Sequence, residues 1–222
     1  MTEEDWHSES NPGPMLEHLK RRLRVAPRAR GRKFRLTAVE FLRLRTDMVS
    51  NPRVARAVEA GEAMCDGAGT LPDVSAILAE AGLRADPSDL PGWGFVLKFL
   101  LSPDSFTAAH EIAGLTHRVR WPTPGRAGYA RDELTMASQA WIIRDVFGNP
   151  FRPATCPPSW RTSAAGALAE SVYEARDFAA MPVLADALEE AGCDDADVLT
   201  HCRGPGPHVR GCWVVDLVLG KA

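Results

Sequence analysis

The chain has 222 residues, of which 45% are hydrophobic, and a formal net charge of -3 at pH 7. This length suits one large domain or two small ones with a buried core. The small net charge indicates no class of partner, and no apolar run has the length of a membrane span. The first residues are acidic and polar, unlike a secretory signal, so we expect a cytoplasmic protein without membrane contact.

Five cysteines are spread at irregular spacing along the chain, at Cys65, Cys156, Cys193, Cys202 and Cys212. Disulfide frameworks are typical of small secreted proteins with an even number of cysteines. An odd number in a chain of this size therefore predicts reduced thiols.

Two Asn-Pro pairs predict helix starts in the N-terminal part. Asn11 and Asn51 are good N-caps, and the prolines that follow them fit the first helical turn. Between these pairs, the stretch 35–49 places its leucines and Val39 on one stripe with arginines beside it. This pattern predicts an amphipathic basic helix.

Three further helices are expected, at 72–82, 93–101 and 105–113. The segment 115–132 contains two prolines and two glycines and is typical of a long loop. We therefore expect an N-terminal helical region with the basic helix (1–114), a Pro/Gly-rich loop or linker (115–132) and a C-terminal helical module (133–222).

Apolar residues at helical spacing predict helices at 133–147, 164–176 and 181–191, and then a short helix that ends at Arg203. The last apolar run, 212–219, fits a helix or, because of its valines, a strand; a helix is favoured. The predicted fold class is all-α, an irregular helical bundle with a possible short strand near the C-terminus.

Histidine and cysteine are both zinc ligands, so a cluster of them near the C-terminus indicates a possible metal site: Cys193, His201, Cys202, His208 and Cys212. An intact helix between Cys193 and Cys202 would place them on opposite faces, too far apart to share an ion. Cys202 also has the helical spacing of a core residue. The metal hypothesis nevertheless keeps Cys202, together with His208 and Cys212, as its three ligands. No CxxC motif supports it.

Catalysis by Cys212 or Asp216 with His201 or His208 is a further hypothesis, because a nucleophile and a base within hydrogen-bond reach would suffice. Proximity in the sequence does not establish that geometry, and no catalytic residue is assigned.

Three basic side chains surround a turn with two prolines: Arg203, His208 and Arg210. The prolines lack the N-H groups of a phosphate-binding loop. The three side chains are instead expected to form a positive tip that binds an anionic partner.

The stretch 20–45 holds eleven Lys or Arg residues and one acidic residue, Glu40. Clustered positive charge attracts nucleic-acid phosphates irrespective of sequence. The residues expected to make such contacts are Arg28, Arg30, Arg32 and Lys33. An electrostatic surface for the chain's own acidic C-terminal half is the alternative, because residues 165–222 hold ten acidic and four basic residues.

Three stretches carry a resemblance to known proteins: FGNPFRP, LADALEEAG and CRGPGPHVRGCWVVDLVLGK. With these stretches and the opening Met1–Trp6, the chain resembles a large family of uncharacterised paralogues from planctomycete bacteria of the Gemmata type. Residues 184–190 with Gly192 are also similar to the repeat-companion domain of these bacteria, although Ala187 replaces an aromatic residue of that pattern. Neither resemblance implies an activity.

Plentiful apolar helix faces without a convergent polar set favour a non-enzymatic adaptor or regulatory protein that docks another protein and holds no cofactor. The resemblance implies that the protein is bacterial. The docking surface would be the acidic C-terminal module or the basic N-terminal helix. The alternatives are nucleic-acid binding through 20–45 and a metal-binding protein or enzyme centred on His208 and Cys212.

Overall fold

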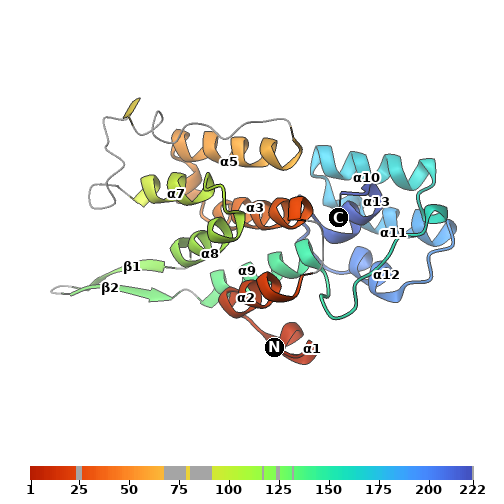
Figure 1. The fold of residues 1–222 in the computed structure, drawn as a ribbon, viewed down its shortest axis with the longest axis horizontal. Helices are drawn as coiled ribbons and strands as arrows, with labels where there is room; N and C mark the ends of the chain where they lie inside the picture. The colour runs from red at the N-terminus through yellow and green to blue at the C-terminus, as the bar shows by residue number, and fades with distance from the viewer. Residues whose placement is uncertain are drawn as a thin grey trace.

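The computed structural model describes residues 1–23, 27–67, 79–80, 92–116, 118–123, 126–131 and 133–221. The fold is all-α, as predicted (Figure 1). The helices are α1 (Glu3–Ser8), α2 (Pro12–Arg22), α3 (Pro27–Arg43), α4 (Thr46–Val49), α5 (Pro52–Cys65), α7 (Gly92–Leu100), α8 (Ser105–Thr116), α9 (Glu133–Phe147), α10 (Ser163–Ala175), α11 (Met181–Glu190), α12 (Ala196–Arg203) and α13 (Trp213–Leu219). Single 3-10 turns lie at Pro158–Trp160 and Phe178–Ala180.

The predicted helix starts are confirmed by their side-chain caps. The side chain of Asn11 accepts a hydrogen bond from the backbone N-H of Gly13, and that of Asn51 accepts one from Arg53, each at 3.0 Å. Asp195 caps α12 in the same way. These short-range contacts satisfy N-H groups that the first helical turn leaves unpaired.

The amphipathic basic helix predicted at 35–49 differs from the structure in its bounds, since α3 ends at Arg43 and Thr46–Val49 form the separate helix α4. Helix α3 begins earlier, at Pro27, and every residue from Lys33 to Leu42 is buried. The helix is therefore central rather than peripheral. Its charged side chains can be buried because partners on other helices and on the C-terminal part meet them, as described below.

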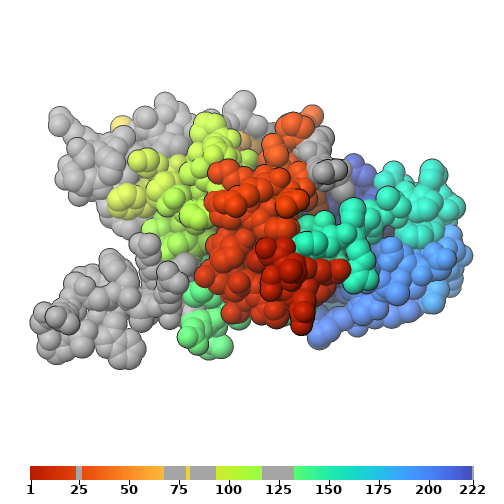
Figure 2. Space-filling view, turned by 60° about the horizontal axis from the view of Figure 1, so that its bottom comes forward, coloured from red at the N-terminus to blue at the C-terminus, as the bar shows by residue number. Residues whose placement is uncertain are grey.

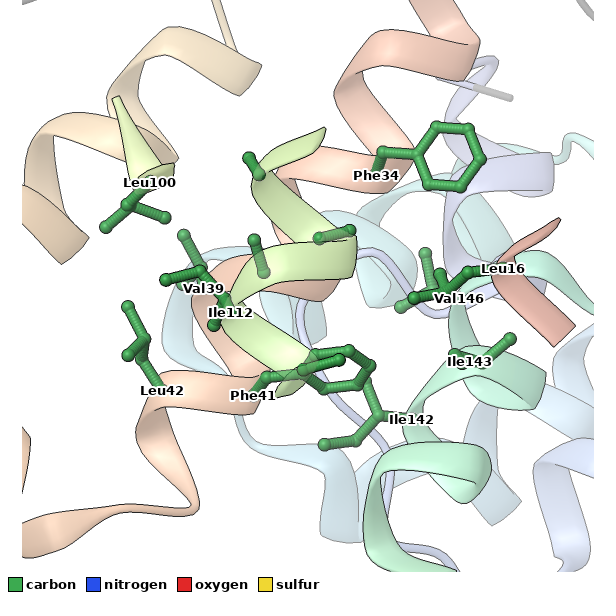
Figure 3. Packing of buried hydrophobic residues seen from close by; sticks show 14 of the residues in the cluster. Leu16, Phe34, Val39, Phe41, Leu42, Leu100, Ile112, Ile142, Ile143 and Val146 are labelled. Carbon is green, nitrogen blue, oxygen red and sulfur yellow. The ribbon is translucent and has the colours of Figure 1, made fainter. Parts of the chain in front are cut away.

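The first hydrophobic cluster forms around α3, from residues of α1, α2, α5, α7, α8 and α9. Figure 3 shows side chains from α3, α8 and α9 converging, among them Val39, Ile112 and Ile143. The ring of Phe34 lies edge-on to Phe106, with centroids 5.4 Å apart, and 5.1 Å from the Phe147 centroid.

The second hydrophobic cluster consists of residues from Trp160 to Val218 and lies within α10 to α13 and their connections. The run 212–219, which could have been a strand, forms α13 with Cys212 as its N-cap residue. Cys202 is fully buried in this cluster, as its helical spacing predicts.

The segment 115–132, expected to be a loop or linker, contains a two-stranded antiparallel hairpin. Strand β1 (Arg118–Thr123) pairs with β2 (Arg126–Arg131) so that Arg118 lies opposite Arg131. Helix α9 follows the hairpin and packs into the first cluster. Residues 160–218 form the second cluster, and Val209 also packs against the first. The division into 1–114, 115–132 and 133–222 stays a prediction.

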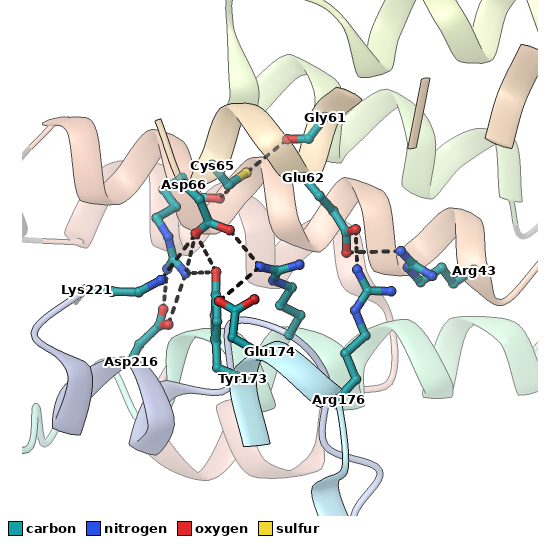
Figure 4. Close-up of polar contacts among 12 residues, drawn as sticks. Arg43, Gly61, Glu62, Cys65, Asp66, Tyr173, Glu174, Arg176, Asp216 and Lys221 are labelled. Atoms are coloured by element: carbon teal, nitrogen blue, oxygen red, sulfur yellow. Dashed lines mark hydrogen bonds and ion pairs between the residues drawn. The ribbon is translucent and has the colours of Figure 1, made fainter. Parts of the chain in front are cut away.

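Polar side chains connect the two clusters (Figure 4). Both terminal nitrogens of Arg32 in α3 donate to the carboxylate of Asp216 in α13, and Nη2 also donates to the Tyr173 hydroxyl at 2.8 Å. That hydroxyl donates to Asp66 at 2.6 Å. The carboxylate of Asp66 also accepts a hydrogen bond from Arg210 at 2.8 Å.

A second ion-paired group lies beside the first. Glu62 of α5 is paired with Arg43 of α3 at 3.0 Å and with Arg176, which follows α10 (Figure 4). Arg32 and Arg43 of the basic stretch are thus matched by acidic partners inside the protein.

Among the described residues, no helix has the length and apolar character needed to span a membrane. The helix expected at 72–82 lies outside the described residues, apart from 79–80.

Candidate metal centre

Four side chains with metal-ligating chemistry meet where α9 adjoins the second cluster: Asp145, His201, His208 and Cys212. Asp145 lies near the end of α9, His201 in the last turn of α12 and Cys212 at the start of α13, while His208 belongs to the connection between α12 and α13. One donor atom from each residue lies within 4.8 Å of all the others.

The carboxylate of Asp145 is the centre of this group. Its Oδ1 lies 3.1 Å from Nε2 of His201 and 2.8 Å from Nδ1 of His208. The Sγ of Cys212 lies 3.2 Å from the same His201 nitrogen and 4.0 Å from the same His208 nitrogen. All four donor atoms therefore surround one point.

These separations agree with the edges of a tetrahedral zinc site. Zinc bonds of about 2.0 Å to nitrogen or oxygen and about 2.3 Å to sulfur imply edges of about 3.3 Å between N and O and about 3.6 Å between N and S. The two N to O distances are slightly shorter and the two N to S distances bracket the expected value. Shifts of a few tenths of an ångström would complete the coordination.

Backbone structure positions the ligands. The backbone N-H of Val209 donates to Oδ2 of Asp145 at 2.8 Å, which orients the carboxylate with Oδ1 toward the cluster. Gly211 has a φ of +95°, and a Cβ there would lie 2.7 Å from Cδ1 of Leu36. Only glycine lets the connection approach α3 this closely just before Cys212.

Burial and hydrogen bonds set the charge of the cluster. Burial alone raises the pKa of Asp145, but the hydrogen bonds with His201 and His208 outweigh it and the pKa is lowered. Burial raises the pKa of the Cys212 thiol well above its ordinary value, and the charge of Asp145 adds to this. Without a cation, the cysteine is therefore a neutral thiol.

The same geometry disfavours a catalytic triad. In a Cys-His-Asp triad the two imidazole nitrogens have separate partners, one the nucleophile and the other the carboxylate. Here one nitrogen, Nε2 of His201, faces both Cys212 and Asp145. Asp216, the alternative to Cys212 in the catalytic hypothesis, pairs with Arg32.

A cleft of about 290 Å³ reaches the cluster from the side of Asp145 and His201, and Trp6, Trp141 and Trp213 are among its walls. His201 is the most exposed of the four ligands, with 17% of its side chain accessible. His208 provides the second imidazole of the group, and its Nε2 is buried without a hydrogen-bond partner among the described residues. An ion could enter along the His201 side.

The structure brings together only two of the three metal ligands expected from sequence, His208 and Cys212. Cys202 is fully buried, lies outside the group, and has its pKa raised by burial to about 12. The sequence hypothesis missed Asp145 as a ligand and did not commit to His201. No short sequence motif can include Asp145, because it lies 63 positions before His208. His201 lies 11 positions before Cys212, with the end of a helix between them, so their spacing does not match a zinc-ligand motif.

The positive tip expected at Arg203, His208 and Arg210 does not form. Arg203 donates to Asp186 at 2.7 Å and to Glu189 at 2.6 Å. His208 points toward Asp145 in the group of candidate metal ligands. Arg210 pairs with Asp66 and lies over the Tyr173 ring. Each of the three side chains therefore has its own intramolecular partner. Binding of an anionic partner by these residues stays a prediction.

The four residues expected to bind nucleic acid are divided between the surface and the interior of the protein. Arg28 is exposed and Arg30 half-buried, whereas Arg32 and Lys33 point inward. Lys33 is 5% exposed and donates to the backbone oxygen of Val146 at 2.7 Å. Half of the expected phosphate contacts are therefore used inside the protein.

No family model, curated protein or solved structure matches this chain. The resemblance to the planctomycete paralogues therefore stays a prediction.

Proposed function

We propose that this chain is a non-enzymatic zinc-binding protein, in which one ion held by Asp145, His201, His208 and Cys212 ties the C-terminal helices to α9. The convergence of four donor atoms from four separate segments carries the proposal. This mixture of imidazole, thiolate and carboxylate at tetrahedral spacing is the donor set of zinc rather than of calcium or magnesium, which take oxygen ligands.

A hydrogen-bonded cluster without metal is the competing account. An imidazole nitrogen either donates or accepts, so Nε2 of His201 cannot donate to Asp145 and also accept from the thiol of Cys212. A cation at the centre satisfies every donor atom at once. It would also favour the thiolate form of Cys212, since coordination to zinc deprotonates a cysteine.

Four protein ligands favour a structural role for the ion. Catalytic zinc sites usually have three protein ligands and an open position for water or substrate, whereas structural sites are closed. Asp145 lies on α9, whose apolar residues belong to the first hydrophobic cluster, and Cys212 belongs to the second. The ion would cross-link the two, in support of a stable module that docks another protein, as the sequence predicts.

Metal analysis by mass spectrometry tests the proposal on protein purified without chelator. The wild type is expected to hold one zinc ion per chain, and Asp145→Ala and Cys212→Ser are expected to hold background amounts. Cys156→Ser and His110→Ala are matched controls, because both residues lie outside the cluster. A wild type without zinc after refolding in its presence, or ligand variants that keep it, would contradict the proposal.

A further inference from the structure

A second cavity, of about 530 Å³, lies between α2, the first half of α3 and the segment 147–154. Figure 2 shows the N-terminal helices and the segment after α9 side by side on one face of the molecule. None of the four metal ligands lines this cavity, although Trp213 does. It adjoins the cleft beside Asp145 and His201, with which it shares Gly148, Asn149, Arg152, Asp197 and Trp213, and its volume is within the range of small-molecule pockets.

Lys33 provides the unusual feature of the cavity. Its side chain lines the cavity although the residue is only 5% exposed. One of its three N-H groups donates to the backbone oxygen of Val146, an acceptor that the end of α9 leaves free. Within the described part of the chain, Lys33 has no ion pair and no second hydrogen bond. Burial lowers the pKa of Lys33, and the more distant charges of Asp216 and Asp145 oppose this only in part, so its ammonium form is costly without an anion in contact with it.

The other charges of the cavity do not compensate Lys33. Arg22 also lines it, and no described residue forms an ion pair with Arg22. Arg152 is already balanced by Glu3, 2.6 Å away. The acidic residue of the lining, Asp197, is exposed. Among the described residues, Arg22 therefore has no ion-pair partner, and Lys33 has N-H groups that are free to donate to an anion.

The walls of the cavity are flat and largely apolar. The rings of His18 and Phe151 are stacked, with centroids 5.0 Å apart and planes 25° apart. The indole of Trp213 lies against Gly148, where a Cβ would be 3.1 Å from its ring atoms. These surfaces suit the body of a planar ligand rather than a bare inorganic ion.

We propose that this cavity binds a small organic anion with a flat apolar body, whose carboxylate or phosphate accepts hydrogen bonds from Lys33 and Arg22. The body lies against the aromatic walls. Charge-assisted hydrogen bonds in a partly desolvated pocket are among the strongest polar contacts that a protein makes with a ligand. The ligand also brings a negative charge into contact with Lys33.

Isothermal titration of the full chain tests the site with three probes: benzoate, phenyl phosphate and neutral benzyl alcohol. At least one of the two anions is expected to bind with saturation, and benzyl alcohol to bind at least about tenfold more weakly. The tighter of the two anions identifies the head group. Saturation by neither anion, or equal affinity for benzyl alcohol, would refute the proposal.

Two variants locate the binding. Lys33→Met keeps the apolar stem and removes the charge, and it is expected to weaken anion binding about tenfold or more. Arg22→Gln changes an exposed residue, so it should fold normally and weaken binding by several-fold. Lys98→Met and Arg21→Gln are the matched controls, since neither residue lines the cavity. Unchanged affinity in both test variants would place the anion elsewhere and contradict the assignment.

Discussion

The Nε2 atom of His201 lies 3.2 Å from the Sγ of Cys212, although the two residues belong to different helix ends. The same nitrogen lies 3.1 Å from the carboxylate of Asp145 in α9. One imidazole nitrogen cannot both donate to a carboxylate and accept from a neutral thiol, so hydrogen bonding alone leaves one of these two contacts unsatisfied. Both contacts are what a shared cation requires, and this arrangement links the folding of α9 to that of α12 and α13.

Removal of the metal should destabilise the wild type. An ion present at about 1,000 times its dissociation constant contributes about 4 kcal/mol to the free energy of unfolding, which corresponds to a change in melting temperature on the order of 10 °C. We expect this loss when a chelator is added, measured by circular dichroism, and its reversal by zinc. Cys212→Ser should show a low melting temperature that the chelator does not change. An identical response in both proteins would argue against the metal centre.

The ion pair between Arg32 and Asp216 should contribute more to the free energy of unfolding than the exposed charge of Arg28 on the same helix. Asp216 is fully buried, so Arg32→Ala leaves its charge uncompensated and is expected to cost about 3–5 kcal/mol in urea unfolding. Arg28→Ala on the same helix changes an exposed residue and should cost no more than about 0.5 kcal/mol. Equal losses would show that the pair does not contribute as the structure indicates.

Glu40 should make stability depend on pH. Burial raises its pKa from 4.5 to about 7, while Arg43 and Arg176 lower it and Glu62 raises it further. The folded state therefore binds this proton more tightly than the unfolded state, so its stabilising contribution is present at low pH and is lost as pH rises from 4.5 to about 7.

Replacement of Glu40 by glutamine removes this dependence. Relative to the wild type, Glu40→Gln should gain up to about 3 kcal/mol in unfolding free energy between about pH 4 and pH 8. Denaturant unfolding at several pH values measures the difference, with Glu17→Gln as the control on α2. A difference that does not change with pH would mean that Glu40 titrates normally.

Gly211 should not tolerate a side chain. Its φ of +95° disfavours any other residue, and a Cβ would meet Leu36 at 2.7 Å. Gly211→Ala is expected to destabilise the protein by about 1–3 kcal/mol and to weaken zinc binding, because Cys212 would shift. Gly166→Ala in α10 is the matched control: nothing lies within 4 Å of the added Cβ, so stability should rise by about 0.5–1 kcal/mol. A neutral Gly211→Ala would show that the connection can move away from α3.

Local contacts explain what could be predicted from the sequence. The caps at Asn11, Asn51 and Asp195 act over two or three residues, so the helix starts and the all-α class follow from short patterns. The burial of α3 does not follow from them, because Arg32 and Lys33 resemble surface residues until Asp216 and the end of α9 meet them.

The candidate metal site could be predicted only in part for the same reason. His208 and Cys212 are close in sequence and were recognisable as possible ligands. Asp145 belongs to a helix that packs into the other hydrophobic cluster, and only the tertiary fold brings its carboxylate to them. Cys202 was a false candidate, because the phase of α12 places it in the core while His201, one residue earlier, points to the cluster.

The absorption spectrum of the protein refolded with cobalt(II) in place of zinc tests the central claim most directly. A tetrahedral site with one cysteine predicts strong visible d-d bands together with a thiolate-to-cobalt charge-transfer band in the near ultraviolet. Cys212→Ser should lose the charge-transfer band, while Cys156→Ser should keep the wild-type spectrum. A wild-type spectrum of octahedral, solvent-bound cobalt, or a charge-transfer band that survives in Cys212→Ser, would contradict a metal centre at these four residues.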